Sequence, residues 1–166
     1  GTGTSVNLTG LSVSTTYHFA IYEYETGNSC NLYNASQLTG NFTTATPAIS
    51  TSASFSTFVA CAGSAGTAQS FTASGSNLTT DITVTAPTGY EVSTDNSSFS
   101  SSVVLSESGG SVTSTTIYVR LTSSASNGAS GNVACTSTGA STQNEATSSG
   151  TVHSTPGTQA SSFTSS

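Results

Sequence analysis

Apolar and polar residues alternate in short runs along most of this chain. In the stretch from residue 16 to 25, Tyr17, Phe19 and Ile21 alternate with more polar neighbours. A period of two places successive side chains on opposite faces of a β-strand, whereas a helix would need apolar residues three or four apart. No stretch of the chain shows that helical spacing. The pattern therefore predicts an all-β chain made of antiparallel β-sandwich modules in tandem.

The middle of the chain, residues 48–152, predicts one complete sandwich. Its short apolar runs recur at the spacing of about 8–12 residues that is typical of β-sandwiches. Turn signals such as Pro87-Thr88-Gly89 and Asn127-Gly128 separate them. The expected strands are 49–58, 69–74, 81–85, 90–93, 103–105, 115–121, 132–137 and 143–152.

Residues 1–47 predict only part of a second sandwich. Strands are expected at 5–9, 16–25 and 38–44, with a hairpin loop at 27–31. Three strands are too few to bury both faces of a sandwich. The chain is therefore expected either to be cut from something longer or to borrow strands from a neighbour.

A tyrosine corner is predicted at the start of the strand 16–25. Leu11 precedes Tyr17 by six residues, Thr residues lie between them, and apolar alternation follows. In a tyrosine corner, a Tyr at the start of a strand packs its ring in the core and forms a hydrogen bond with the preceding turn. Leu11 and Tyr17 are the residues that would form it.

The same segment resembles the corresponding region of a fibronectin type III domain, so residues 1–47 are expected to be the C-terminal part of such a domain. Three ordered segments, 70–78, 82–93 and 116–120, resemble an immunoglobulin-like module that is repeated in large secreted and surface proteins of the Bacteroidota. Residues 153–166 resemble a linker and the first strand of a further fibronectin-type module. The resemblance implies a window on a tandem array, exported by the type IX route and displayed on a bacterial cell surface as an adhesin.

Composition narrows the function further. The 166 residues include a single Lys or Arg, and the net charge is −6. Nucleic acids and anionic membranes attract clusters of basic residues, so neither is an expected partner. Charged residues make up only 5% of the chain, and Ser and Thr supply its polar surface. A disordered Ser/Thr-rich stalk is disfavoured, because the apolar residues alternate regularly. No apolar run approaches the length of about 18 residues that a membrane helix needs, and export signals are expected to lie outside this segment.

Three cysteines suggest an exported protein with disulfides. Cys135 shares a strand face with Val133, and Cys61 follows an apolar run, so a Cys61–Cys135 bridge is expected. Closing a loop of about 75 residues would stabilise the domain by roughly 4 kcal/mol. The alternative is two buried free thiols. Cys30 is left over, unpaired or paired with another module or subunit.

No catalytic, cofactor-binding or metal-binding residue is predicted, and the chain is not expected to be an enzyme. Neither His18 nor His153 has an acidic partner nearby in the sequence, and no G-x-S-x-G motif occurs. The pair Asp95-Asn96 indicates a turn rather than a calcium loop. A calcium site at a module junction stays open. The one basic residue, Arg120, is expected to pair with Glu91 or to stack on Tyr90.

These observations favour a structural role as a stalk or filament segment of an extracellular, multi-module adhesin. Its expected partners are neighbouring modules or subunits of the same protein, with surface glycans or other cells as further candidates. In a second hypothesis the chain is a filament subunit that donates a strand to the next copy. The donating residues would be Gln159, Ala160, Ser161, Ser162 and Phe163. A third is a carbohydrate-binding accessory module of a secreted enzyme, with Tyr22 and Tyr24 stacking on sugar.

Overall fold

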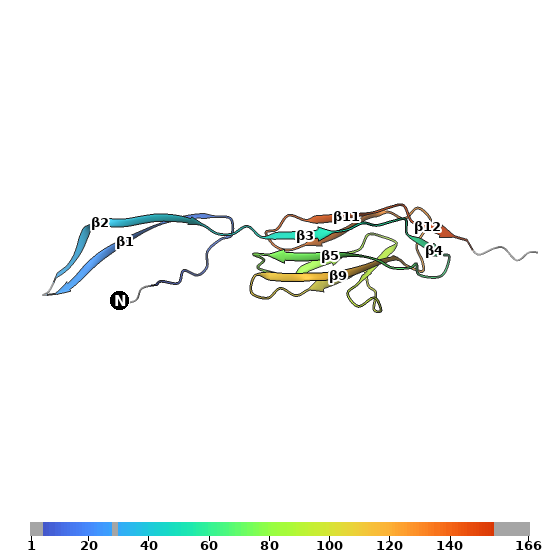
Figure 1. Cartoon of the computed structure of the whole chain (residues 1–166), viewed down its shortest axis with the longest axis horizontal. Coiled ribbons are helices and arrows are strands. Elements are labelled where there is room, and N and C mark those ends of the chain that lie inside the picture. Colours follow the sequence, from blue (N-terminus) through green and yellow to red (C-terminus); the bar gives the residue numbers. More distant parts are fainter. Residues whose placement is uncertain (1–4, 28–29, 155–166) are drawn as a thin grey trace, which may run out of the picture. The chain divides into compact units, whose positions relative to one another are not determined.

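The computed structural model describes residues 5–27 and 30–154, and for 24–27 and 30–35 it describes the backbone alone. Strands supply all the regular secondary structure of these residues, so the all-β prediction is confirmed (Figure 1). Because the described residues form no helix, they contain none that is long and apolar enough to cross a membrane. The chain divides into two compact units, Gly1–Pro47 and Ala48–Ser166, which we call unit 1 and unit 2.

Unit 1 contains one antiparallel hairpin. Its strands are β1 (Thr16–Gly27) and β2 (Cys30–Thr43). The register places Tyr17 opposite Phe42 and Ile21 opposite Leu38, so the apolar residues of both strands share one face, as the alternation predicts. A bulge interrupts the register between Tyr22 and Tyr24.

Two strand predictions for unit 1 are wrong. Residues 5–9 form no strand, and β2 begins at Cys30 rather than at residue 38. The alternation in 5–9 is compatible with a strand, but a strand also needs a neighbouring backbone with which to form hydrogen bonds. In β2 the long pairing with β1 supplies such a neighbour even where the sequence is polar.

Unit 2 contains two four-stranded antiparallel sheets. One has the order β3-β5-β9-β7 and the other β11-β10-β6-β8. The strands of the first sheet are β3 (Ala48–Ser52), β5 (Gln69–Ser76), β7 (Tyr90–Ser93) and β9 (Ser111–Leu121). Those of the second are β6 (Ile82–Thr85), β8 (Ser102–Leu105), β10 (Gly131–Thr136) and β11 (Gln143–Thr147). Most lie within one or two residues of the predicted strands.

The largest departure from the prediction is a separate parallel pair, β4 (Val59–Cys61) with β12 (Thr151–His153). The expected strand 49–58 ends at Ser52, and β4 begins only at Val59. The expected strand 143–152 is divided into β11 and β12 by residues 148–150. Because β4 and β12 are so far apart in the sequence, no local pattern predicts that they pair.

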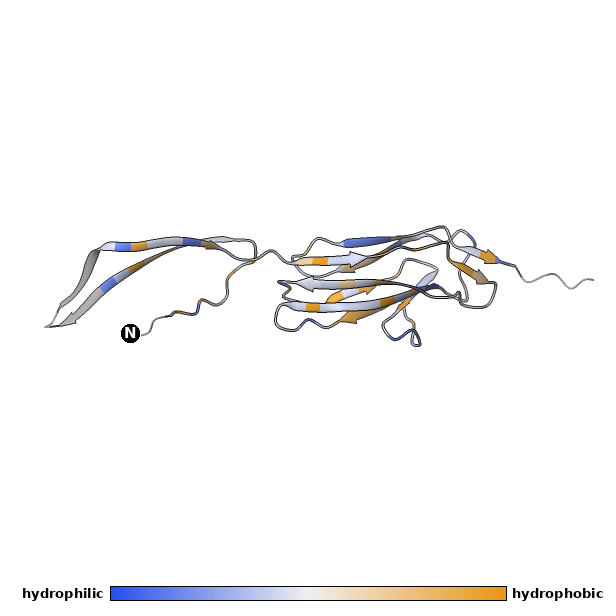
Figure 2. Cartoon of the chain, viewed as in Figure 1, coloured by the Kyte–Doolittle hydropathy of each residue, from blue (hydrophilic) through white to orange (hydrophobic). Residues whose placement is uncertain are grey.

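The core of unit 2 lies between the two sheets. Phe58, Ile117, Leu121 and Val133 are among its fully buried side chains. The ring of Phe58 meets that of Tyr90 edge-on, with the ring centroids 5.1 Å apart. Apolar positions alternate with polar ones along the strands (Figure 2). Within the described residues, every buried polar side-chain atom has a hydrogen-bond partner.

The chain enters and leaves unit 2 at opposite ends of β9. Ala48 lies opposite Ser76, and Ser76 lies opposite Ser111, the first residue of β9. At the other end, Gly150, just before β12, packs against the side chain of Leu121, the last residue of β9. The ten steps from the first to the last residue of β9, at about 3.3 Å each, separate these ends by roughly 33 Å. Figure 1 shows β3 beginning at one end of unit 2 and β12 ending at the other.

Candidate functional site

Of the two predicted tyrosine-corner residues, Tyr17 lies at the start of β1 and Leu11 lies in the segment before it. The hydroxyl of Tyr17 accepts a hydrogen bond from the backbone N–H of Ser12, with a donor–acceptor distance of 2.8 Å. The Tyr17 ring stacks on Phe42, with centroids 5.8 Å apart. Leu11 and Tyr17 are both half-buried. The hydroxyl therefore ties the turn before β1 to the hairpin, but the ring is only partly covered.

One face of the hairpin of unit 1 is apolar and exposed. We call it the hairpin face; it comprises Phe19, Ile21, Leu38 and Phe42, flanked by Val6 and Leu8. The exposed fraction of the residue is 39% for Phe19, 56% for Ile21 and 67% for Leu38, and Phe42 is half-buried. Val6 and Leu8 line a hollow of about 620 Å³ together with Phe19, Ile21 and Phe42. Contiguous exposed apolar surface of this kind is typical of an interface rather than of a free surface.

The expected bridge between Cys61 and Cys135 is not formed, and both are free cysteines. In β4 the side chain of Ala60 is buried, so those of its neighbours Val59 and Cys61 point outward. Cys135 is fully buried in β10, where it pairs with Val84 of β6. An outward side chain on one strand and an inward one on another cannot meet. The alternative of two buried thiols is also wrong, because Cys61 is exposed.

Burial makes the thiol of Cys135 unreactive. Burial, with a contribution from the charge of Glu145, raises its pKa to about 11. A thiol reacts as the thiolate, so this group stays protonated and unreactive at neutral pH. The predictions for the side chain of Cys30 and for the donor segment from Gln159 to Phe163 lie outside the described residues.

Arg120 forms an ion pair and a stacking contact on the outer side of the β7–β9 pair. Its Nε donates to Glu91 Oε1 at 2.7 Å, which confirms that expected pairing. The aromatic partner was predicted wrongly: the guanidinium lies 3.6 Å from the centroid of the Phe99 ring, not against Tyr90. Phe99 follows the 94–98 loop, so the contact fixes that loop on the sheet. This arrangement accounts for Arg120 structurally.

Asp95 caps the loop that follows β7, as predicted. Its Oδ1 accepts hydrogen bonds from the backbone N–H groups of Ser98 and Ser97 at 2.7 and 2.8 Å, and from the hydroxyl of Ser93 at 2.7 Å. These donors, with Ser98 contributing most, hold the pKa of Asp95 at about 2. Asn96 adopts a φ of 56°, a conformation that Asn tolerates in turns. The Oδ1 atom of Asp95 therefore serves to hold this loop.

Tyr90 occupies the end of unit 2 where the chain leaves. Its ring is buried, and its hydroxyl donates to the carbonyl oxygens of Ser148 at 2.9 Å and Ala129 at 3.2 Å. Burial raises the pKa of this hydroxyl. The sequence suggested Tyr90 as a strand residue and as the alternative stacking partner of Arg120. It did not suggest these hydrogen bonds, because their acceptors are backbone carbonyls about 40 and 60 positions away.

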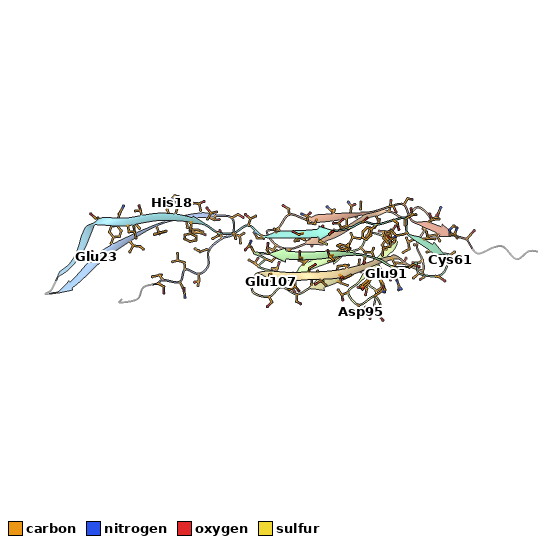
Figure 3. All side chains as sticks on the ribbon, in the orientation of Figure 1. His18, Glu23, Cys61, Glu91, Asp95 and Glu107 are labelled. Atoms are coloured by element: carbon orange, nitrogen blue, oxygen red, sulfur yellow. The ribbon has the colours of Figure 1, made fainter. Side chains whose placement is uncertain are left out.

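The ionisable side chains that the structure describes are dispersed over the two units. His18 and His153 are both exposed. No three His, Cys, Asp or Glu side chains in the described part of the chain converge as metal ligands would. Within unit 2, Figure 3 shows Glu107 and Cys61 at opposite ends, with Asp95 on the loop beyond Glu91. Tyr22, a candidate sugar-stacking residue, is 49% exposed on β1.

Comparison with protein-family models, with curated proteins and with solved structures found no match to this chain.

Proposed function

We propose that this chain is a structural segment of an extracellular, multi-module surface adhesin, stalk or filament. The observation that carries the proposal is the position of the chain ends in unit 2. Ala48 and β12 lie at opposite ends of β9, so a folded module of this kind adds roughly 33 Å to the end-to-end length of a tandem array. Modules joined in this way form a string in which each contacts mainly its neighbours.

The surface chemistry supports the same role. Hydroxyl groups cover much of the exposed surface, and charged residues make up 5% of the sequence. Contacts between charged groups of neighbouring copies are therefore few, which suits closely packed extracellular material. The resemblance to modules of the Bacteroidota supports display on a cell surface after export by the type IX route.

Surface labelling tests this proposal. Antibodies raised against unit 2 should label intact cells of the producing organism, and protease added outside the cells should remove the signal. A cytoplasmic protein serves as the control for cell integrity and should stay protected. Labelling that appears only after the cells are permeabilised would refute an extracellular role.

The hairpin face favours a second candidate function, assembly by strand addition. Ile21 and Leu38 are more than half exposed, and among the described residues β1 and β2 pair only with each other. A strand added along the hairpin would gain backbone hydrogen bonds and could cover part of the apolar face. The expected donor is the segment from Gln159 to Phe163 of another copy.

Deletion of residues 156–166 tests this candidate. The purified full chain and the deleted chain are compared by analytical ultracentrifugation and electron microscopy at the same concentrations. Strand donation predicts oligomers or filaments from the full chain and only monomers from the deleted one. Oligomers of equal size from both chains would refute donation by this segment.

A further inference from the structure

The strand through which the chain leaves unit 2 is held on both of its edges. We call residues 150–153, which include β12, the exit strand. On one edge, the N–H of Thr151 donates to the carbonyl of Phe58 at 2.8 Å, and the carbonyl of His153 accepts from Ala62 at 2.9 Å. These two bonds flank the parallel pairing of β12 with β4. A strand at the edge of a sheet pairs on one side only. The bonds to β4 and its flanking residues would therefore be enough to hold the exit strand as an edge strand.

The other edge of the exit strand is bound by residues 127–129. The N–H of Gly150 donates to the carbonyl of Ala129 at 2.8 Å, and the carbonyl of Gly150 accepts from Gly128 at 2.8 Å. The N–H of Val152 donates to the side-chain Oδ1 of Asn127 at 2.9 Å. Asn127 thus supplies, from its side chain, the acceptor that a neighbouring strand would supply from its backbone. Gly128 has a φ of +86°, which a residue with a side chain rarely adopts.

The direction of the strands determines how these bonds respond to tension. β4 and β12 are parallel, with Val59 opposite Thr151 and Cys61 opposite His153. When the two ends of unit 2 are pulled apart, β4 is drawn by its first residue and β12 by its last. The two strands then slide against each other, and their hydrogen bonds are strained together instead of one after another. If β3 detaches first, the load passes along residues 53–58 to the same pair.

We propose that the exit strand, β4 and residues 127–129 form a mechanical clamp that resists unfolding when unit 2 is stretched end to end. The clamp deepens the proposed function and rests on it, because only a stalk or filament under tension would use such a device. Asn127 contributes to the clamp through its side chain. The buried Tyr90 contacts the clamp through the hydrogen bonds from its hydroxyl to the carbonyls of Ser148 and Ala129. Resistance depends on direction, since the same bonds would open in sequence if pulled from one end.

Single-molecule force spectroscopy of the full chain, held by handles at its two ends, tests the clamp. Unfolding of the 107 residues 48–154 should lengthen the chain by roughly 350 Å, which identifies these events. Asn127→Ala removes one bond of the clamp and should speed unfolding at a given force roughly fivefold. Asn127→Asp keeps an Oδ1 acceptor and should restore most of the resistance.

A matched control lies elsewhere in the same unit. The hydroxyl of Ser137 donates to the carbonyl of Thr80 at 2.8 Å, away from the exit strand. Ser137→Ala should lower stability against urea about as much as Asn127→Ala, yet leave the rate of forced unfolding within about twofold of the parent. Equal acceleration by Asn127→Ala and Ser137→Ala would show that resistance is spread over the unit and would overturn the clamp.

The exposed thiol of Cys61 allows the direction of pulling to be changed. With Cys30→Ser in place, one handle is attached at Cys61 and the other at the C-terminus, so force is applied across the facing residues Cys61 and His153. The clamp predicts that β12 then peels away at a clearly lower force than end-to-end unfolding requires. Equal forces in both directions would overturn it. Both measurements use the isolated chain and test the clamp alone. Surface labelling of cells tests the proposed extracellular role, so either result can be negative while the other is positive.

Discussion

Replacing Tyr90 with Phe should lower the free energy of unfolding of unit 2 by about 1 kcal/mol. The ring is 3% exposed and would keep its edge-on contact with Phe58, so the change removes only the hydroxyl. That hydroxyl donates mainly to the carbonyl of Ser148 at 2.9 Å. Its second acceptor, the carbonyl of Ala129, keeps the hydrogen bond from Gly150. The loss is therefore close to that of one net hydrogen bond.

Urea denaturation and thermal unfolding measure this loss. A loss of about 1 kcal/mol should lower the melting temperature by roughly 4–8 °C in a unit of this size. Tyr118→Phe is the matched control: Tyr118 is half-buried on β9, and its hydroxyl makes no hydrogen bond within the described residues. That variant should unfold within about 0.5 kcal/mol of the parent. Equal losses from Tyr90→Phe and Tyr118→Phe would refute the role assigned to the Tyr90 hydroxyl.

Alkaline pH gives the same prediction a second readout. Burial raises the pKa of Tyr90 above its ordinary value of 10.0. The unfolded chain therefore releases this proton at a lower pH than the folded chain, and stability falls as the pH rises through 10 and above. The Tyr90→Phe variant should lack this part of the decline, whereas Tyr118→Phe should retain it. A parallel decline in Tyr90→Phe and in the parent would contradict the assignment.

Three further predictions concern single residues of unit 2. Burial raises the pKa of the Cys135 thiol from 9.0 to about 11, so the free energy of unfolding should fall by up to about 1.4 kcal/mol per pH unit between pH 9 and 11. Cys135→Ser should abolish this fall. An unchanged dependence on pH in urea denaturation would contradict the prediction. The carboxyl of Asp95 should titrate near pH 2 by NMR, and Asp95→Asn should remove the loss of stability that protonation brings as the pH falls from about 4 to 2. Gly150→Ala should destabilise by roughly 1–3 kcal/mol, because a Cβ there would lie 2.8 Å from a methyl group of the fully buried Leu121; unaltered thermal stability would show that this contact yields easily.

The alternation of apolar and polar residues was sufficient to predict most of unit 2. β7 was predicted with its observed bounds, and Val133 and Cys135 share the buried face of β10 as expected. These predictions succeeded because each strand is half-buried within an antiparallel sheet, where the pattern of one strand reports its own burial. The pairing of Arg120 with Glu91 was also foreseen, since the chain offers only one basic side chain.

The sequence did not predict features that depend on distant partners. The parallel pairing of β4 with β12 joins residues about 90 positions apart. Without it, Cys61 looked like part of an apolar run, and only the burial of Ala60 in β4 shows that Cys61 points outward. The role of Asn127 was hidden for the same reason: Asn-Gly signals a turn, and nothing local shows that its side chain reaches Val152.

The mass of the polypeptide in its native source tests the central proposal most directly. Antibodies against unit 2 would detect the chain on a gel under denaturing and reducing conditions, which separates covalent length from disulfide or subunit association. A segment of a tandem-module adhesin predicts a species many times heavier than the 16.4 kDa of these 166 residues. A species near 16.4 kDa would contradict that account and identify the chain as a discrete subunit.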